Sequence, residues 1–318
     1  MLSLKTALRG TLVASCVIVG ATGAQAQNFI NVLTGGTSGV YYPLGVGLSN
    51  IYAEKIEGVR TQVQSTKASV ENLNLLQSGR GEIGFALGDS VAAAWAGDAE
   101  AGFPEKLDQL RGIAAIYPNF IQLVALEESG VSTLADLAGK GVSVGAPASG
   151  TELNARAIFG AAGMSYEDFG KTEYLPFAES VELMKNRQLD ATLQSAGLGV
   201  ASIRDLSSSV PITVVEIPAA LAESLGAPYQ AATIPANTYD GQETDVPTIA
   251  ISNYLVSHAE VSEEVAYQMT KQLFENIETL TASHQAAAKI TLEHALDGMP
   301  VPLHPGAERY YREMGILK

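Results

Sequence analysis

The amino-acid sequence predicts an α/β fold with two lobes, each a mainly parallel sheet flanked by helices, and a ligand cleft between them. Short runs rich in β-branched residues alternate with helical patterns along the chain, which is typical of such sheets. One order of strand, glycine-containing loop and helix also occurs twice. The 318 residues leave room for two compact lobes at roughly 100 to 200 residues each, although the length alone also permits one large domain.

The first 26 residues have the pattern of a cleavable secretory signal. Lys5 and Arg9 precede an apolar stretch over residues 11–20, and Ala24-Gln25-Ala26 supplies the small residues of a cleavage site after Ala26. The apolar stretch is shorter than the roughly 18 residues that a membrane-spanning helix needs. We therefore expect export to the periplasm, with residues 27–318 as the mature protein.

Cys16 leaves a second outcome open, because Val13-Ala14-Ser15 before it resembles a lipoprotein processing site. Cleavage after Ala26 leaves no cysteine in the mature chain, which excludes disulfides, thiol nucleophiles and cysteine metal sites. Two of the 19 basic residues lie in the signal, so the mature chain keeps 17 against 34 acidic residues, a formal net charge of −17. This charge disfavours nucleic acid and anionic membranes as partners. It does not exclude an anionic ligand held by local dipoles, and solubility alone also explains it.

The first part of the mature chain contains three predicted strands, each followed by a helix. The strands are residues 29–33, 60–64 and 83–87. The helices are indicated by Leu44, Leu48 and Ile51 on one face, by Leu73 and Leu76 between Ser69 and a stop at Gly79, and by Asp89 as an N-cap.

The same order returns in the middle of the chain. The strands there are residues 141–145, 172–175 and 189–193, and the helices carry Leu153, Ala157 and Ile158, then Val181 and Met184. Two short matches recur 111 residues apart, Ser38-Gly39 with Ser149-Gly150 and Ser69-Val70-Glu71 with Ser180-Val181-Glu182. Coincidence is one explanation, and two lobes of similar build are the other.

The remaining residues complete the predicted domain organisation. Residues 247–256 read as a strand that crosses back between the lobes, and Val265, Met269, Leu273 and Ile277 mark a helix that should pack on the first lobe. The first lobe is predicted to hold residues 27–116 and 233–318, and the second residues 117–232.

Ligands of such sheets bind beyond the carboxyl ends of the parallel strands, at helix N-termini. The loop 35–39 lets backbone N–H groups approach a ligand, and the helix after it adds partial positive charge, which together make an anion cradle. The loop lacks the spacing of a dinucleotide fold and the lysine of a P-loop, and an ordinary tight turn also explains it. Tyr41 and Tyr42 offer phenolic donors or core packing.

Ser149-Gly150-Thr151-Glu152 offers a matching cradle in the second lobe, although Ser149 with Glu152 is also a capping box. Further polar residues stand where strands end or helices begin, and for each a cap or turn is the alternative explanation. They are Thr66, Ser69, Asn72, Gln194 and Ser195.

One enzyme motif is present, because residues 141–145 fit the GxSxG pattern of a serine hydrolase. The nucleophile elbow needs its serine on a sharp turn directly before a helix, whereas Ser143 lies between two valines and Pro147 follows. We therefore expect no enzyme, with a secreted hydrolase that uses Ser143 as the alternative. His258, His284, His294 and His304 show no metal-ligand spacing, and no metal or cofactor is predicted.

Four motifs together resemble the TAXI-type solute-binding proteins of tripartite ATP-independent periplasmic (TRAP) transporters. They are residues 37–43 (TSGVYYP), 69–73 (SVENL), 149–152 (SGTE) and 302–308 (PLHPGAE), and the resemblance covers essentially the whole mature chain. It implies a type II periplasmic-binding-protein-like fold, closure around an organic acid or amino acid such as glutamate, and delivery by a monomer to a small and a large membrane subunit. It implies no catalysis. A periplasmic ligand sensor is a further alternative.

The resemblance also implies the ligand contacts, by position. They are Gly36, Thr37, Ser38, Tyr41, Thr66, Ser69, Asn72, Asp89, Ser149, Gly150, Thr151 and Gln194. The chain departs from the family at Leu87-Gly88, where a polar residue often precedes the aspartate, and at Gln194, where an aromatic residue is common. Both departures concern ligand choice, so glutamate is the first expectation and a related C4–C5 dicarboxylate such as 2-oxoglutarate the second.

Overall fold

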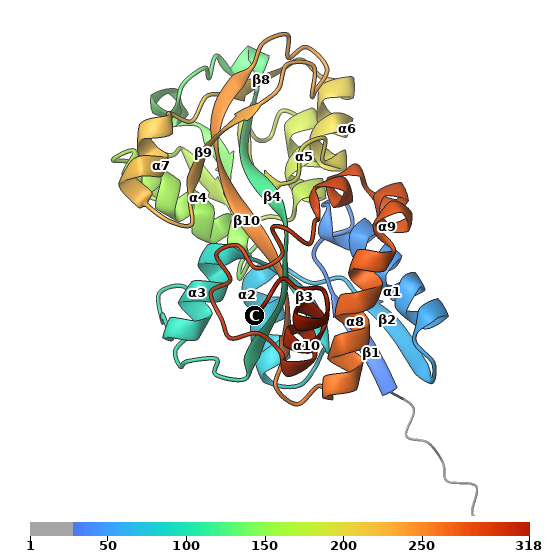
Figure 1. Ribbon diagram of the computed structural model, residues 1–318. Coiled ribbons are helices and arrows are strands. Elements are labelled where there is room, and N and C mark those ends of the chain that lie inside the picture. The colour runs from blue at the N-terminus through green and yellow to red at the C-terminus, as the bar shows by residue number, and fades with distance from the viewer. Residues whose placement is uncertain (1–27) are drawn as a thin grey trace, which may run out of the picture.

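Two long strands, β4 (Leu110–Leu126) and β10 (Val246–His258), run through both lobes of the molecule (Figure 1). They pair with each other antiparallel from Ala250 and Phe120 at one end to His258 and Leu110 at the other. The computed structural model describes residues 28–318. The predicted signal peptide and Cys16 therefore lie outside the described residues.

The first lobe is built on three parallel strands, with β1 (Asn28–Leu33) between β2 (Val59–Gln64) and β3 (Ile83–Leu87). The helices α1 (Tyr41–Lys55), α2 (Ser69–Gln77) and α3 (Gly88–Ala96) each follow one strand. The apolar face predicted for α1 is buried against the sheet, with Leu44 and Leu48 fully enclosed. Gly79 adopts a positive φ of 64° just after α2, which explains why the helix stops there.

The second lobe repeats this arrangement. Its central strand β5 (Gly141–Ser143) pairs in parallel with β6 (Lys171–Glu173) and β7 (Ala191–Ala196), and α4 (Gly150–Ala161) and α5 (Phe177–Lys185) occupy the places of α1 and α2. The two serine-valine-glutamate triplets are not equivalent, however. Ser69 opens α2, whereas Ser180 is the fourth residue of α5. The topology is duplicated. The two triplets do not occupy corresponding positions in it, so their sequence match is coincidental.

Further elements complete the second lobe and its connections. They are β8 (Ile212–Val215), β9 (Gln230–Ile234), α6 (Ala201–Ser209), α7 (Ala219–Leu225) and the short 3₁₀ turns at Glu127–Ser129, Leu134–Leu137 and Tyr166–Asp168.

The chain crosses between the lobes within β4 and β10. β4 pairs with β10 from Leu110 to Phe120 and with β7 of the second lobe from Phe120 onward, so the boundary predicted after residue 116 lies within the β4–β10 pairing. The return crossing lies later than the boundary predicted at residue 233. Val246–Ala250 still pair with β9 of the second lobe, and pairing with β3 begins only at Asn253. The reason is the β9–β10 hairpin, because β9 is short and largely exposed and lacks the apolar alternation that predicts a strand.

The C-terminal helices pack on the first lobe, as predicted, with α8 (Glu263–Glu275) and α9 (Ile277–Ser283) beside α1 (Figure 1). The predicted single helix is divided at Asn276, whose side chain donates to the Gln272 carbonyl oxygen at 2.9 Å. A 3₁₀ turn (Gln285–Lys289) and α10 (Pro305–Glu313) follow. None of the helices within residues 28–318 is both long and apolar enough to cross a membrane.

Candidate ligand-binding site

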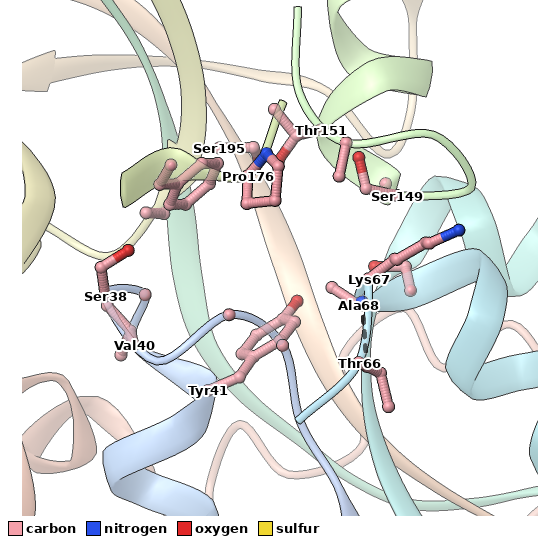
Figure 2. Close-up of a pocket in the computed structure, with 18 of the residues that line it drawn as sticks. Ser38, Val40, Tyr41, Thr66, Lys67, Ala68, Ser149, Thr151, Pro176 and Ser195 are labelled. Carbon is pink, nitrogen blue, oxygen red and sulfur yellow. Dashed lines mark hydrogen bonds between the residues drawn. The ribbon is translucent and has the colours of Figure 1, made fainter. Parts of the chain in front are cut away.

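A cavity of about 310 Å³ lies between the two lobes, beyond the carboxyl ends of their parallel strands. In Figure 2, Ser38, Tyr41 and Thr66 of the first lobe face Ser149, Thr151 and Pro176 of the second. Nine of the twelve predicted contact residues line this cavity. They are Gly36, Thr37, Ser38, Tyr41, Thr66, Ser69, Ser149, Gly150 and Thr151.

The loop between β1 and α1 forms one wall. It is folded into a tight turn by a hydrogen bond from the Gly39 N–H to the Gly36 carbonyl oxygen at 3.0 Å. The N–H groups of Thr37, Ser38 and Val40 have no acceptor among the described residues. Those of Tyr41 and Tyr42 open α1 and have no carbonyl to reach. This wall therefore presents several unpaired donors to the cavity.

The turn before α2 forms the adjacent wall. Thr66 Oγ1 accepts from the Ala68 N–H at 3.0 Å, the bond drawn in Figure 2, and lies 2.9 Å from the Thr34 carbonyl oxygen. Ala68 adopts φ 75° and ψ −140°, a conformation that costs a non-glycine residue on the order of 1–3 kcal/mol. Such strain persists only where neighbouring contacts hold it, and here it aims the start of α2 at the cavity.

The second lobe contributes the N-termini of α4 and α5. The Ser149 side chain caps α4 by accepting from the Glu152 N–H at 3.2 Å. The predicted capping box is only half formed, because the Glu152 carboxylate pairs with Arg156 at 2.6 Å instead. The Gly150 and Thr151 N–H groups remain without an acceptor among the described residues, as do those of Phe177 and Ala178 at the start of α5.

Four helices thus direct their N-termini at one cavity. Each helix N-terminus carries roughly half a positive charge, and unpaired N–H groups there bind anions. Among the described residues that line the cavity, only Lys67 and Glu179 carry full charges, and both side chains are exposed. The electrostatics of the cavity are therefore set by the helix ends.

The floor of the cavity is a hydrogen-bond network that joins Tyr41 of α1 to asparagines on the crossing strands. The Tyr41 hydroxyl donates to Asn253 Oδ1, and Asn253 Nδ2 donates to Asn119 Oδ1 and to the Tyr117 carbonyl oxygen, both at 2.8 Å. Asn119 Nδ2 in turn donates to the Ser195 carbonyl oxygen at 2.9 Å. Burial raises the pKa of the Tyr41 and Tyr117 hydroxyls well above their ordinary value, so both remain protonated.

Two predicted contact residues are buried in the lobes instead of lining the cavity. Asn72 donates to the carbonyl oxygens of Thr34 at 2.6 Å and Phe85 at 2.9 Å, which ties α2 to the sheet. Gln194 lies within β7 and accepts from the Ser202 hydroxyl of α6 at 2.6 Å. β7 extends to Ala196, and its last two residues, Ser195 and Ala196, line the cavity in place of Gln194.

Asp89 is the third predicted contact residue that does not line the cavity. It also does not cap α3, which begins at Gly88 after Leu87. Its Oδ1 accepts from the Ser90 N–H at 2.6 Å, and its Oδ2 accepts from Asn154 at 2.5 Å and Tyr229 at 2.8 Å in the second lobe. Burial raises the pKa of the Asp89 carboxyl, while the hydrogen bonds from Tyr229 and Ser90 oppose that rise.

Several lining residues were not predicted as contacts. Those on the second helix of each lobe are Lys67 and Ala68 before α2, and Pro176, Phe177 and Ala178 at α5. The duplicated order was a usable signal for α5, because the start of α5 corresponds to the start of α2. Tyr117 and Asn119 sit inside the crossing strand β4, where no local pattern marks them.

The two lobes are in contact around the cavity. The Glu71 N–H of α2 donates to the Ala148 carbonyl oxygen of the second lobe at 3.2 Å. Gly150 packs so closely on the first lobe that a Cβ atom there would lie 2.6 Å from Ser69 Oγ. The described arrangement is therefore closed.

The geometry does not form a hydrolase nucleophile at Ser143. This side chain is fully buried at the end of β5 and shares a 2.7 Å hydrogen bond with Ser180. The buried His304 ring is hydrogen-bonded to the Val261 carbonyl oxygen through Nε2. Its Nδ1 accepts from the Gly306 N–H, so His304 caps α10. Within residues 28–318, no three His, Cys, Asp or Glu side chains are grouped so that they could hold a metal ion.

The fold is shared with periplasmic solute-binding proteins of known structure. The periplasmic binding protein BugD is 10% identical, with a TM-score of 0.57, over 91% of this chain and 94% of BugD. PhnD1 from Prochlorococcus marinus, in complex with methylphosphonate, is 9% identical, with a TM-score of 0.56, over 92% and 100% of the two chains. The alkanesulfonate-binding protein SsuA from Xanthomonas axonopodis pv. citri, bound to MOPS, is 15% identical, with a TM-score of 0.51, over 84% and 85%.

These similarities confirm the predicted fold class, an α/β fold of the periplasmic-binding-protein kind. The model of the NMT1-like family matches residues 32–315, which is nearly the whole of the described structure. The chain belongs to the NMT1-like family.

Proposed function

We propose that this protein is an exported solute-binding protein that encloses a small organic anion between its lobes and delivers it to a membrane transporter. The observation that carries this proposal is the convergence of four helix N-termini, with unpaired N–H groups, on one cavity of about 310 Å³. That volume is at the small end of ligand pockets, which run from about 300 to 1,000 Å³. It suits a ligand of a few carbon atoms.

The hydroxyl groups around the cavity add directional contacts. Thr37, Ser38 and Thr151 supply hydroxyls from both lobes, and one carboxylate of the ligand would rest on the loop at Thr37 and Ser38 while residues 149–151 close over it. Contacts that exist only in the shut form drive closure toward the bound state. Glutamate, or a related C4–C5 dicarboxylate such as 2-oxoglutarate, fits this arrangement because a negative group can meet helix ends of either lobe.

The transporter belongs to the proposal through the resemblance to TAXI-type proteins. Three of the resembling motifs, residues 37–43, 69–73 and 149–152, contribute lining residues to the cavity. The motif at 302–308 instead fastens α10 to β4, since the Gly112 N–H donates to the Pro302 carbonyl oxygen at 2.8 Å and the His304 N–H returns a bond at 2.9 Å. We propose periplasmic delivery to the small and large membrane subunits of a TRAP transporter on this basis.

A thermal-shift screen of the exported protein tests the proposal. Amino acids, C4–C6 carboxylates, alkanesulfonates and alkylphosphonates are compared at equal concentration, because a ligand that binds only the native state raises its melting temperature. We expect glutamate or 2-oxoglutarate to raise it. No shift with any anion would contradict solute binding, and turnover of a chromogenic ester that disappears in Ser143→Ala would favour the hydrolase.

A further inference from the structure

A polar contact joins the two lobes outside the ligand cavity. Asp89 on α3 belongs to the first lobe, whereas Asn154 on α4 and Tyr229 before β9 belong to the second (Figure 1). Asp89 Oδ2 accepts from Asn154 Nδ2 at 2.5 Å and from the Tyr229 hydroxyl at 2.8 Å. None of these three residues lines the cavity.

The first lobe fixes the Asp89 carboxylate in advance. Its Oδ1 accepts from the Ser90 N–H at 2.6 Å within α3 and lies 3.3 Å from the Ser90 hydroxyl. Oδ2 is left to point at the second lobe, and both donors that reach it come from there. If the lobes separated, Oδ2 would therefore lose both of its hydrogen-bond donors, whereas Oδ1 would keep the Ser90 N–H.

The contact is part of a longer interface between α4 and the first lobe. Arg156, two residues after Asn154 on α4, donates from Nη1 to the Glu100 carbonyl oxygen of the first lobe at 2.8 Å. The Arg156 side chain is held for this by Glu152, at 2.6 Å. α4 thus meets the first lobe through side-chain bonds at two places, in addition to Gly150 at the cavity.

We propose that Asp89, Asn154 and Tyr229 form a latch that holds the lobes closed without contacting the ligand. This inference rests on the proposed function, since it makes the three residues positioning residues for ligand capture. The latch sets the ratio of closed to open molecules before any ligand arrives. It therefore scales the affinity for every ligand by the same factor.

The effect of the latch on the closed-to-open ratio can be measured in the ligand-free exported protein from the distances between two spin labels. The mature chain as predicted has no other cysteine, so Glu105→Cys in the first lobe and Glu223→Cys in the second, both exposed, take the labels specifically. Tyr229→Phe removes one donor from a partly buried carboxylate. We expect it to lower the closed-to-open ratio about tenfold, as for one lost hydrogen bond to a charged group.

Two further variants separate the latch from a general defect in folding. Asp89→Ala leaves the Tyr229 hydroxyl without an acceptor, and leaves Asn154 Nδ2 only the Tyr229 oxygen at 3.3 Å. It should therefore open the protein further, whereas Asp89→Asn keeps an acceptor for Tyr229 and should restore closure relative to Asp89→Ala. Asn154 Oδ1 has no partner in the structure and could accept from the new amide. The controls are Tyr267→Phe, which removes a hydroxyl that donates to Glu313 among the C-terminal helices, and Glu57→Gln, which alters an exposed side chain.

Two results would overturn the latch: a ligand-free protein that is entirely open, or closed fractions that match in Tyr229→Phe, Asp89→Ala and the controls at equal melting temperature. If Asp89 instead touched the ligand, its variants would change glutamate and 2-oxoglutarate affinity unequally at an unchanged closed fraction. Because the distances are measured without ligand, the latch can hold even if no solute binds. Conversely, solute binding can be real while the latch fails.

Discussion

Gly150 occupies the place where α4 of the second lobe meets the first lobe, and alanine there should obstruct closure. A Cβ atom at this position would lie 2.6 Å from Ser69 Oγ and 2.7 Å from Leu87 Cδ1. Non-bonded carbon atoms settle at about 3.5 to 4.0 Å, so the Ser69 and Leu87 side chains must give way, or the lobes must part, by roughly 0.8 Å or more. The change acts only on the closed form, because these neighbours belong to the other lobe.

The cost follows from the packing. Extra methyl groups in a well-packed contact cost typically 1–3 kcal/mol, which corresponds to about 5- to 150-fold weaker binding. Gly150 is the first residue of α4, where alanine should not lower the stability of the open protein, since glycine is the poorer helix residue by roughly 0.5–1 kcal/mol. We therefore expect alanine at this position to weaken ligand binding without lowering the melting temperature of the ligand-free protein.

Calorimetric titration with the strongest ligand from the thermal-shift screen measures this effect. Gly160→Ala is the matched control, because it lies on the same helix and its Cβ atom would meet nothing within 4 Å. We expect wild-type affinity for Gly160→Ala and weakened binding for Gly150→Ala at an unchanged ligand-free melting temperature. Equal affinity of both variants would refute the closed contact between Gly150 and Ser69.

Three further outcomes follow from the site and its supports. Replacing Thr37 and Ser38 together by alanine should weaken ligand binding tenfold or more by calorimetry, because hydrogen bonds to charged groups contribute about 1.5–3 kcal/mol each; an exposed control, Thr244→Ala, should bind normally. Tyr41→Phe leaves Asn253 Oδ1 without a donor and should lower the free energy of unfolding by about 1–3 kcal/mol in denaturant titrations. Burial lowers the pKa of His304 in the folded protein below its ordinary 6.5. The stability that the buried neutral ring contributes is therefore fully present above pH 6.5 and is lost as the pH falls through the lower pKa of the folded protein. The melting temperature should drop from pH 7 to pH 5, and less so in His304→Asn; an unchanged slope would contradict this.

Local patterns were sufficient for most of the fold. The strands and helices of both lobes follow from hydrophobic periodicity and from stop signals such as Gly79, and the duplicated order predicted two lobes of similar build. The β9–β10 hairpin was missed because β9 is short and largely exposed, so that it lacks the apolar alternation of a half-buried strand.

Residues of the candidate site could be predicted from the sequence where they stand at the start of a helix. They could not be predicted where contacts between distant parts of the chain determine which way a side chain points. Ser149 and Thr37 stand at strand-to-helix loops and line the cavity. Gln194 does not, because it lies within β7 and its side chain is bonded to Ser202 of α6 inside the second lobe. Asp89 has partners 65 and 140 residues away, on the other lobe, and no local pattern encodes that distance.

Thermal shifts of the exported protein with matched pairs of ligands test whether helix N-termini in a closed cleft bind an anion. The pairs are glutamate against glutamine and each dicarboxylate against its uncharged diamide. We expect the charged member of at least one pair to raise the melting temperature, and its neutral amide to bind at least tenfold more weakly. Equal shifts from both members of every pair, or no shift from any anion, would contradict anion binding by the helix ends.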